Sequence, residues 1–275
     1  MLITGGSRGI GRSLAELAAT GGASVAVAAR SNLGLQEVAE AIRSRGADVL
    51  AIAADVTSPE DRHRLVDEVV ERFGGLDVLI NNAGVGSFGH FADSSEAVLR
   101  QVMEVNFFSP AELIRLCLPA LRQGNQPAVV NVASMCGRRG LPAWPEYSAS
   151  KFALCGLTES LRAEMARFDI DVLLILPGLT RTDLGSHLLR NAGRLKIDFT
   201  EGMQPQEVAR QILHALERGR TETVIGREAH WMLRINRFLP RLVDRLMARK
   251  VRRLYADEVK EHRGQPAEPS AAAQK

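Results

Sequence analysis

The chain has 275 residues and a formal net charge of +3, with 45% of its residues hydrophobic and 24% charged. This composition is ordinary for a globular protein and excludes a fibrous or low-complexity chain. The length provides a core that needs no disulfide or metal, and no run of about 18 apolar residues offers a membrane-spanning helix.

Short apolar runs alternate with helix-period segments along the first 225 residues. The runs typical of strands are Leu2-Ile3, Ser24–Ala28, Val49–Ala53, Val78–Ile80, Val129–Val132, Val172–Leu176 and Thr223–Ile225. Between them, Ile10–Ala19 and the segment that opens at Ser58-Pro59 are typical of helices. This alternation predicts an α/β fold, a doubly wound parallel sheet of about seven strands with helices on both faces.

The first strand is short, because Met1 lies only three residues before Thr4. Two interpretations stay open: the natural start lies upstream, or the strand is clipped. The first residues carry no basic segment followed by an apolar signal region, and the three cysteines form no CxxC pair, so we expect a cytoplasmic protein with reduced thiols. The six histidines form no ligand cluster, so no metal site is predicted.

Three regions are expected along the chain: a domain over residues 1–226, a basic amphipathic helical extension over 227–263, and a disordered Pro-, Ala-, Ser- and Gln-rich tail over 264–275. The extension holds eleven Lys/Arg and five Asp/Glu, whereas residues 1–226 carry a net charge of −3. A basic helix with an apolar face is typical of contact with an anionic membrane. Packing on its own domain or on a partner copy stays open, whereas the body lacks a nucleic-acid module, which argues against nucleic acid.

A glycine-rich loop, Thr4-Gly5-Gly6-Ser7-Arg8-Gly9-Ile10-Gly11, follows the first strand and opens the first helix. Glycines let the backbone approach a pyrophosphate, and the helix N-terminus supplies amide donors and the positive end of its dipole. A plain glycine turn is the alternative interpretation. The strand–turn–helix setting favours a dinucleotide site.

Further polar motifs follow the later strands in order. They are Asp55, Asn81-Asn82-Ala83-Gly84, Asn106, Ser134, Tyr147-Ser148-Ala149-Ser150-Lys151, and Pro177-Gly178-Leu179-Thr180-Arg181-Thr182. With the glycine loop, this set resembles the classical short-chain dehydrogenase/reductase family over about residues 1–225. The resemblance implies a Rossmann domain that binds NAD or NADP and catalyses an oxidoreduction, as a homodimer or homotetramer.

The resemblance also implies which residues hold the cofactor. They are Thr4, Gly5, Ser7, Arg8, Gly9, Ile10, Gly11, Arg30, Asp55, Val56, Asn82, Ala83, Gly84, Tyr147, Lys151, Pro177, Gly178, Thr180 and Thr182. The second strand ends at Arg30 without a carboxylate that would hydrogen-bond ribose hydroxyls. Arg30 and Arg8 offer planar donors for a 2′-phosphate, so NADP(H) is predicted over NAD(H). The alternative is that both arginines are simply solvated.

Tyr147 and Lys151 are four residues apart and therefore share one helix face. An ammonium beside the phenol, together with the positive nicotinamide, is expected to lower the pKa of the phenol from about 10, so that Tyr147 exchanges a proton with a carbonyl or alcohol oxygen. Ser134 would orient the same oxygen. The resemblance implies that Lys151 also holds the nicotinamide ribose and that Asn106 positions a water, which completes a catalytic tetrad of Asn106, Ser134, Tyr147 and Lys151.

Apolar residues surround this region. Leu141 and Trp144 precede Tyr147, and Leu184 and Leu188 lie in a segment, 179–204, that the resemblance identifies as a lid. We expect a lipophilic carbonyl or alcohol substrate; packing of the leucines within the lid stays open as the alternative.

The predicted function is NADP(H)-dependent hydride transfer at a ketone or secondary alcohol, against the alternative of a non-catalytic NADP-binding regulator or scaffold. Beyond the domain, the stretch Leu246–Lys250 is similar to the tail of the membrane-associated dehydrogenase/reductase member 7 and 7B type. Peripheral contact with the inner face of a membrane through residues 227–263 is therefore a further hypothesis.

Overall fold

A parallel sheet of seven strands forms the centre of the computed structural model, which describes residues 1–195 and 198–257. Its strands are β1 (Leu2–Thr4), β2 (Val25–Ala29), β3 (Val49–Ala53), β4 (Val78–Asn81), β5 (Ala128–Val132), β6 (Asp171–Pro177) and β7 (Glu222–Ile225). Their order is β3-β2-β1-β4-β5-β6-β7. All seven lie where the apolar runs predict them, so the predicted doubly wound fold is confirmed.

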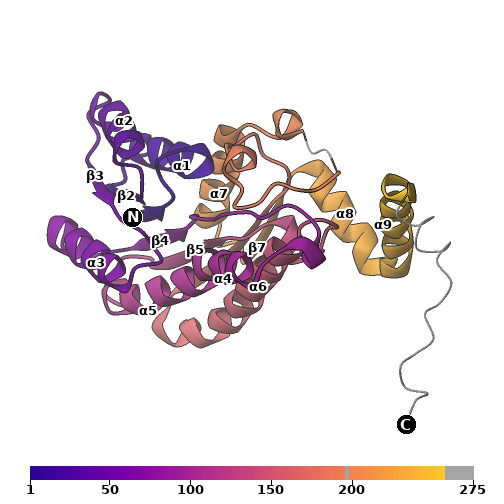
Figure 1. Cartoon of the computed structure of the whole chain (residues 1–275). Coiled ribbons are helices and arrows are strands. Elements are labelled where there is room, and N and C mark those ends of the chain that lie inside the picture. Colours follow the sequence, from indigo (N-terminus) through magenta and orange to yellow (C-terminus); the bar gives the residue numbers. More distant parts are fainter. Residues whose placement is uncertain (196–197, 258–275) are drawn as a thin grey trace, which may run out of the picture. The chain divides into compact units, whose positions relative to one another are not determined.

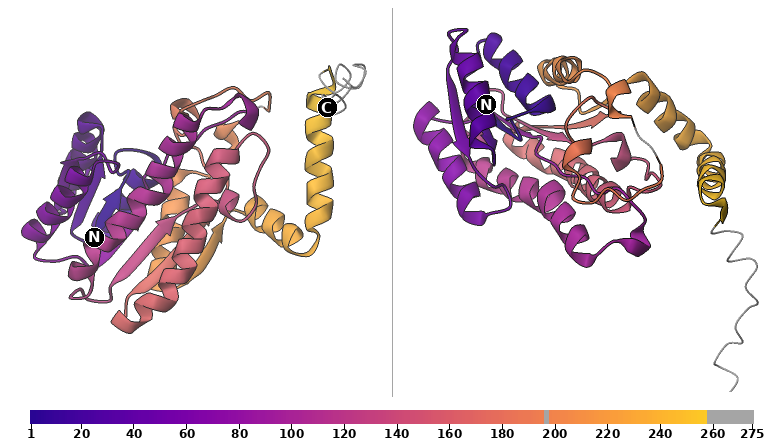
Figure 2. Two further views of the ribbon diagram at one scale, coloured as in Figure 1. Left: turned by 60° about the horizontal axis from the view of Figure 1, so that its bottom comes forward. Right: turned by 45° about the horizontal axis from the view of Figure 1, so that its top comes forward.

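Helices cover both faces of the sheet, as Figures 1 and 2 show. Their bounds are α1 (Gly9–Thr20), α2 (Asn32–Arg43), α3 (Pro59–Phe73), α4 (Glu96–Met103), α5 (Ser109–Leu121), α6 (Pro145–Met165) and α7 (Pro205–Glu217). Helices α1, α2 and α7 contribute to one buried cluster, and α3 and α5 to another. Helix α6 packs on β6 through Leu154.

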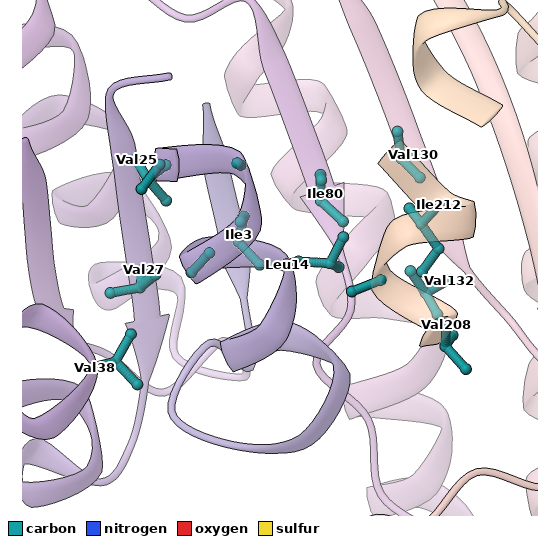
Figure 3. Close-up of a cluster of buried hydrophobic side chains, with 14 of the residues drawn as sticks. Ile3, Leu14, Val25, Val27, Val38, Ile80, Val130, Val132, Val208 and Ile212 are labelled. Carbon is teal, nitrogen blue, oxygen red and sulfur yellow. The ribbon is translucent and has the colours of Figure 1, made fainter. Parts of the chain in front are cut away.

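Successive strand residues point to opposite faces and fill the two clusters. Ile3 and Val27 join the α1, α2 and α7 side, whereas Leu2 and Ala26 join the α3 and α5 side, and all four are fully buried. Figure 3 shows the first cluster, in which Leu14 of α1 lies among strand residues. Burial of each such large side chain contributes about 1.5–3 kcal/mol to folding.

The sheet order reverses beside β1, which pairs with β2 on one side and β4 on the other. Open α/β sheets bind ligands outside the carboxyl ends of the strands at such a switch point. The glycine-rich loop and the segments after β4, β5 and β6 all begin at this edge. The fold therefore gathers the predicted site residues from distant parts of the chain.

The chain divides into two compact units, Met1–Leu233 and a second that starts at Arg234. The seam falls within α8 (Arg227–Phe238), and α9 (Pro240–Leu254) lies wholly in the second unit. Pro240 begins α9, because it lacks the amide that would continue the preceding helix. No helix among residues 1–195 and 198–257 has the length and apolarity needed to cross a membrane. The predicted tail, 264–275, and residues 258–263 lie outside the described residues.

Candidate active site

The glycine-rich loop is shaped by close backbone approaches at the end of β1. Gly5 has φ +65°, and a Cβ there would lie 2.9 Å from Cα of Ala83. A Cβ on Gly11 would overlap the carbonyl oxygen of Gly5. Both positions therefore require glycine.

The first turn of α1 leaves its amides available. Arg8 occupies the N-cap position, and no side chain caps the helix. Uncapped amides at a helix N-terminus, with the positive end of the dipole, form an anion site. The residues present therefore fit the pyrophosphate of a dinucleotide.

Thr4 and Asn82 connect the glycine-rich loop to the segment after β4. Thr4 Oγ1 accepts hydrogen bonds from the amides of Asn82 and Ala83, both at 3.0 Å. Asn82 Nδ2 donates to the carbonyl oxygen of Thr4 at 2.9 Å. A Cβ on Gly84 would lie 3.2 Å from Asn106 Oδ1, so this segment also touches the tetrad. Thr4, Gly5, Asn82, Ala83 and Gly84 thus lie together at the ends of β1 and β4.

Asn106 lies in a π-helical turn, Glu104–Phe108, between α4 and α5. Its Nδ2 donates to Val85 O at 2.9 Å and to Ser150 Oγ at 3.0 Å, and its Oδ1 accepts from Val85 N at 2.9 Å. π-turns inside α-helices are frequent at functional sites. This one places a fully buried amide between the β4 loop and α6.

Ser134, Tyr147 and Lys151 converge at the carboxyl ends of β5 and β6. Lys151 Nζ donates to Val132 O at 3.1 Å and lies 5.8 Å from the centroid of the Tyr147 ring. Ser134 Oγ accepts from Cys136 N at 3.1 Å, and Ser134 also hydrogen-bonds Tyr147. A phenol, a hydroxyl and an ammonium thus meet around one small volume.

Burial changes both titrating groups of this cluster. It lowers the pKa of Lys151 from 10.5 to about 8, because the ammonium loses its water. Burial also raises the pKa of the Tyr147 phenol, and the hydrogen bond with Ser134 only partly opposes this. The expected lowering of the tyrosine pKa includes the charge of the bound nicotinamide and stays a prediction, whereas in the protein alone desolvation of the phenolate is the largest effect and raises the pKa.

The predicted NADP determinants lie on two segments, with Arg30 directly after β2 and Arg8 at the N-cap of α1. Arg8 and Arg30 are exposed, and neither forms an ion pair within the described part of the chain. A Cβ on Gly34 would lie 3.1 Å from Ser7 Cβ, so the start of α2 touches the glycine-rich loop close to both arginines.

The residues after β3 and β6 border the same edge. The Asp55 carboxylate bonds within its own loop, since its Oδ1 accepts from Thr57 N at 2.9 Å. Val56 is buried. After β6, Gly178 N donates to Ile225 O at 2.8 Å, and Thr180 Oγ1 donates to Gly178 O at 3.1 Å. Thr182 lies beside Gly9, whose Cβ would stand 3.2 Å from Thr182 Cγ2. This contact brings the segment that begins at Pro177 against the glycine-rich loop.

Aromatic side chains lie beside the cluster of Ser134, Tyr147 and Lys151. Trp144, 6% exposed, packs edge-on to Tyr147 with ring centroids 5.3 Å apart, and its centroid lies 5.1 Å from that of Phe88. Leu188 and Trp144 both approach Gly86, since a Cβ there would lie 2.7 Å and 3.0 Å from them. The structure thus brings the predicted Trp144 and Leu188 together.

The other two predicted pocket residues, Leu141 and Leu184, are half-buried in the segments that flank this cluster. The lid pairs with the β4 loop: Phe88 N donates to Arg190 O at 2.9 Å, and Ala192 N donates to Phe88 O at 2.8 Å. Residues 86–88 and 189–192 are therefore held together over the aromatic cluster.

Two residues of this region are missed by reasoning from the sequence. The ring centroids of Phe199 and Trp144 are 6.5 Å apart. An aromatic residue within a leucine-rich segment is the sequence signal that could have identified Phe199. Glu146, directly before Tyr147, is 1% exposed, and neither of its carboxylate oxygens has a hydrogen-bond partner in the described structure. Nothing in the sequence marks Glu146, because glutamate in a first helical turn is ordinarily solvated.

The remaining reactive side chains are buried. Cys117, Cys136 and Cys155 are free thiols, and burial raises the pKa of Cys136 and Cys155 to about 11. Such thiols are inert. Within residues 1–195 and 198–257, no cluster of His, Cys, Asp or Glu could hold a metal ion.

A comparison with known proteins identifies the class. The family model of the short chain dehydrogenases matches residues 1–193. The chain is 33% identical to an uncharacterised oxidoreductase, YxnA, of Bacillus subtilis, over 98% of this chain and 76% of that protein. It is 32% identical to dehydrogenase/reductase SDR family member 7B of Bos taurus, over 92% of this chain and 81% of that protein. Both alignments cover a larger share of the chain than the unit Met1–Leu233 makes up.

A solved structure agrees with this assignment. A short chain dehydrogenase/reductase from Burkholderia phymatum, in complex with NAD, superimposes with a TM-score of 0.80 at 26% identity. The match covers 88% of this chain and 93% of that one. The chain belongs to the classical short-chain dehydrogenase/reductase family, and it is an NAD(P)-dependent oxidoreductase that acts on CH–OH and C=O groups.

Proposed function

We propose that this protein reduces the carbonyl of a lipophilic ketone to a secondary alcohol, and reverses that reaction, with NADP(H) as the hydride carrier. One observation carries the proposal: Ser134, Tyr147 and Lys151 meet at the carboxyl edge of the sheet, beneath an apolar aromatic cover. The hydride is the chemistry that the bound nicotinamide supplies. The residues of the chain supply orientation, protons and exclusion of water.

Tyr147 is the proton donor in this scheme. Burial raises the pKa of its phenol, so the proton stays on Tyr147 Oη at neutral pH and is ready for a carbonyl oxygen. Ser134 Oγ shares the hydrogen bond to Tyr147 and orients the substrate oxygen next to it. As that oxygen gains negative charge, the nearby Lys151 ammonium stabilises the phenolate that remains.

Lys151 and Asn106 form the route that returns the proton. With a pKa of about 8, Lys151 gives up and regains a proton near neutral pH more readily than a free lysine does. Asn106 fixes the backbone at Val85 and the hydroxyl of Ser150, and it would position a water beside Lys151.

The preference for NADP(H) rests on charge. Arg8 and Arg30 are exposed beside the start of α2 with no carboxylate partner among the described residues, and β2 ends without an acidic side chain. A 2′-phosphate would pair with both guanidinium groups, which are planar bidentate donors. Exchange of Arg30 for glutamate is therefore expected to favour NADH, measured as the ratio of kcat/KM values for the two cofactors.

The lipophilic substrate class rests on the cover over the tetrad. Trp144 packs on Tyr147, and the rings of Phe88 and Phe199 lie against Trp144. Leu188 approaches Gly86 beside Trp144, and Leu141 and Leu184 lie in the flanking segments. Pockets lined in this way exclude water and favour apolar ligands with one polar group at the reacting carbon.

We also place the enzyme in the cytoplasm as a homodimer or homotetramer, without nucleic acid as a partner. Residues 227–263 would hold it peripherally at a membrane surface, where lipophilic carbonyl compounds collect. The basic balance of the extension supports this position.

The test of the reaction is NADPH oxidation with a panel of lipophilic ketones, compared between the wild type and Tyr147→Phe. Turnover by the wild type and its loss in the variant, with NADPH affinity kept, supports the proposal. If the wild type binds NADPH but turns over no carbonyl, the protein is instead a non-catalytic NADP-binding regulator or scaffold.

A further inference from the structure

Large apolar side chains remain exposed where α8 meets α9. Phe238 is 74% exposed, Leu239 53% and Leu246 55%. Together with Ile235 and Leu242, which are also exposed, they form what we name the apolar corner. Exposed apolar groups are ordinary singly, but a contiguous set on one short segment marks an interaction surface.

Leu239, Leu242 and Leu246 recur at three- and four-residue spacing and form a row that flanks Val243. Val243 is 4% exposed, whereas Leu242 is 43% and Leu246 55% exposed. The apolar side of α9 is therefore broader than the part that is buried at Val243.

Arginines border the apolar corner. Helix α9 carries six basic residues against the single acidic Asp244. Arg241, Arg245 and Arg249 recur every four residues and form a stripe next to Leu242 and Leu246. Within the described chain, no ion pair engages these three side chains. Their charge is therefore available to a partner.

The geometry points to an anionic lipid bilayer as that partner. We infer that the apolar corner inserts at the boundary between headgroups and acyl chains, while Arg241, Arg245 and Arg249 contact anionic headgroups. Leucines with flanking arginines match both layers of such an interface, because long arginine side chains reach the headgroups while the apolar side is buried.

A second copy of the chain fits the charge less well. The corner would then need an apolar partner surface framed by carboxylates, and residues 1–226 carry a net charge of only −3. The bilayer proposal rests on the proposed function, because contact with a membrane would bring a lipophilic substrate to the enzyme. The docking surface itself can be tested without any substrate.

The experiment is sedimentation of the full chain with vesicles of phosphatidylcholine, with and without phosphatidylserine, at low and high salt. The wild type is expected to bind the phosphatidylserine vesicles and to be released by salt. Loss of each arginine is expected to weaken binding about five-fold, so Arg241→Gln/Arg245→Gln/Arg249→Gln loses about a hundred-fold.

Two controls make the test specific. The triple variant Arg100→Gln/Arg115→Gln/Arg210→Gln removes the same charge from exposed sites of the α/β unit and is expected to bind much more tightly than the α9 variant. Leu242→Gln/Leu246→Gln is expected to bind at least about ten-fold more weakly, whereas Leu242→Ile/Leu246→Ile keeps wild-type binding.

Three results would overturn the proposal. The first is that the wild type does not bind the vesicles at low salt. The second is that the two triple arginine variants lose vesicle affinity equally. The third is that Leu242→Gln/Leu246→Gln has a lower solution mass than the wild type, which would assign the corner to a second copy of the chain. NADPH oxidation with a water-soluble ketone, measured without vesicles, is expected to be unchanged in all these variants. If the wild type oxidised no NADPH in this assay, the proposed function would be contradicted, whereas the conclusion from vesicle binding would not change.

Discussion

Replacement of Lys151 by methionine is expected to stabilise the cofactor-free protein at pH 7. The ammonium is 4% exposed, and burial lowers its pKa from 10.5 to about 8. Each unit of pKa is worth about 1.4 kcal/mol, so the buried charge costs roughly 3 kcal/mol below pH 8. Methionine has a similar stem without the charge, but it loses the hydrogen bond to Val132 O, which is worth about 1 kcal/mol. The expected net gain in the free energy of unfolding is about 2 kcal/mol.

The gain is expected to shrink as the pH rises. Above pH 8 the folded wild type releases the proton from Lys151, whereas the unfolded chain keeps it until about pH 10.5. The unfolded state then binds more protons than the folded state, so wild-type stability rises through this window. Lys151→Met has no such proton, so its stability lacks this rise.

Urea denaturation of the cofactor-free protein at pH 7 and pH 9.5 measures both effects. Lys250→Met is the matched control, because Lys250 is exposed and its loss is expected to change stability by less than about 0.5 kcal/mol. A Lys151→Met protein that is less stable than the wild type at pH 7, or a difference that does not change with pH, would refute the reasoning. Activity of this variant is expected to be lost in either case.

Three further variants test other parts of the site. Glu146→Gln is expected to raise the free energy of unfolding at pH 7 by about 1–3 kcal/mol, because a buried unpaired carboxylate is costly; a lower midpoint in urea would contradict this. Gly11→Ala is expected to lower stability by about 1–3 kcal/mol and to abolish NADPH binding measured by fluorescence, whereas Gly156→Ala, in open space on α6, stabilises. Trp144→Leu is expected to cut kcat/KM for a lipophilic ketone about ten-fold with NADPH affinity unchanged, since it removes the ring contact with Tyr147; equal loss for a small ketone would argue against a pocket role.

Much of the fold could be predicted because its signals are local. Buried parallel strands are short apolar runs between amphipathic helices, and each of the seven runs lies in a strand. The Ser58-Pro59 start of α3 also appears as expected, with Ser58 Oγ accepting from Asp61 N at 3.1 Å.

The details that the sequence does not reveal depend on contacts between distant segments. The side chain of Asn106, which lies in a π-turn, hydrogen-bonds to the β4 loop and to α6, and no local pattern predicts this turn. The pKa of Tyr147 is raised in the protein alone by burial, and burial by Trp144 and its neighbours is a tertiary property. A glutamate at the start of a helix is ordinarily solvated, but tertiary packing buries Glu146.

Transfer of deuterium from the C4 position of labelled NADPH tests the central claim most directly. The wild type, incubated with a lipophilic ketone, is expected to give an alcohol with deuterium on the carbinol carbon, detected by mass spectrometry. Tyr147→Phe is expected to give none while it still binds NADPH. Deuterated alcohol from Tyr147→Phe at the wild-type rate, or its absence from the wild type across the ketone panel, would contradict the account.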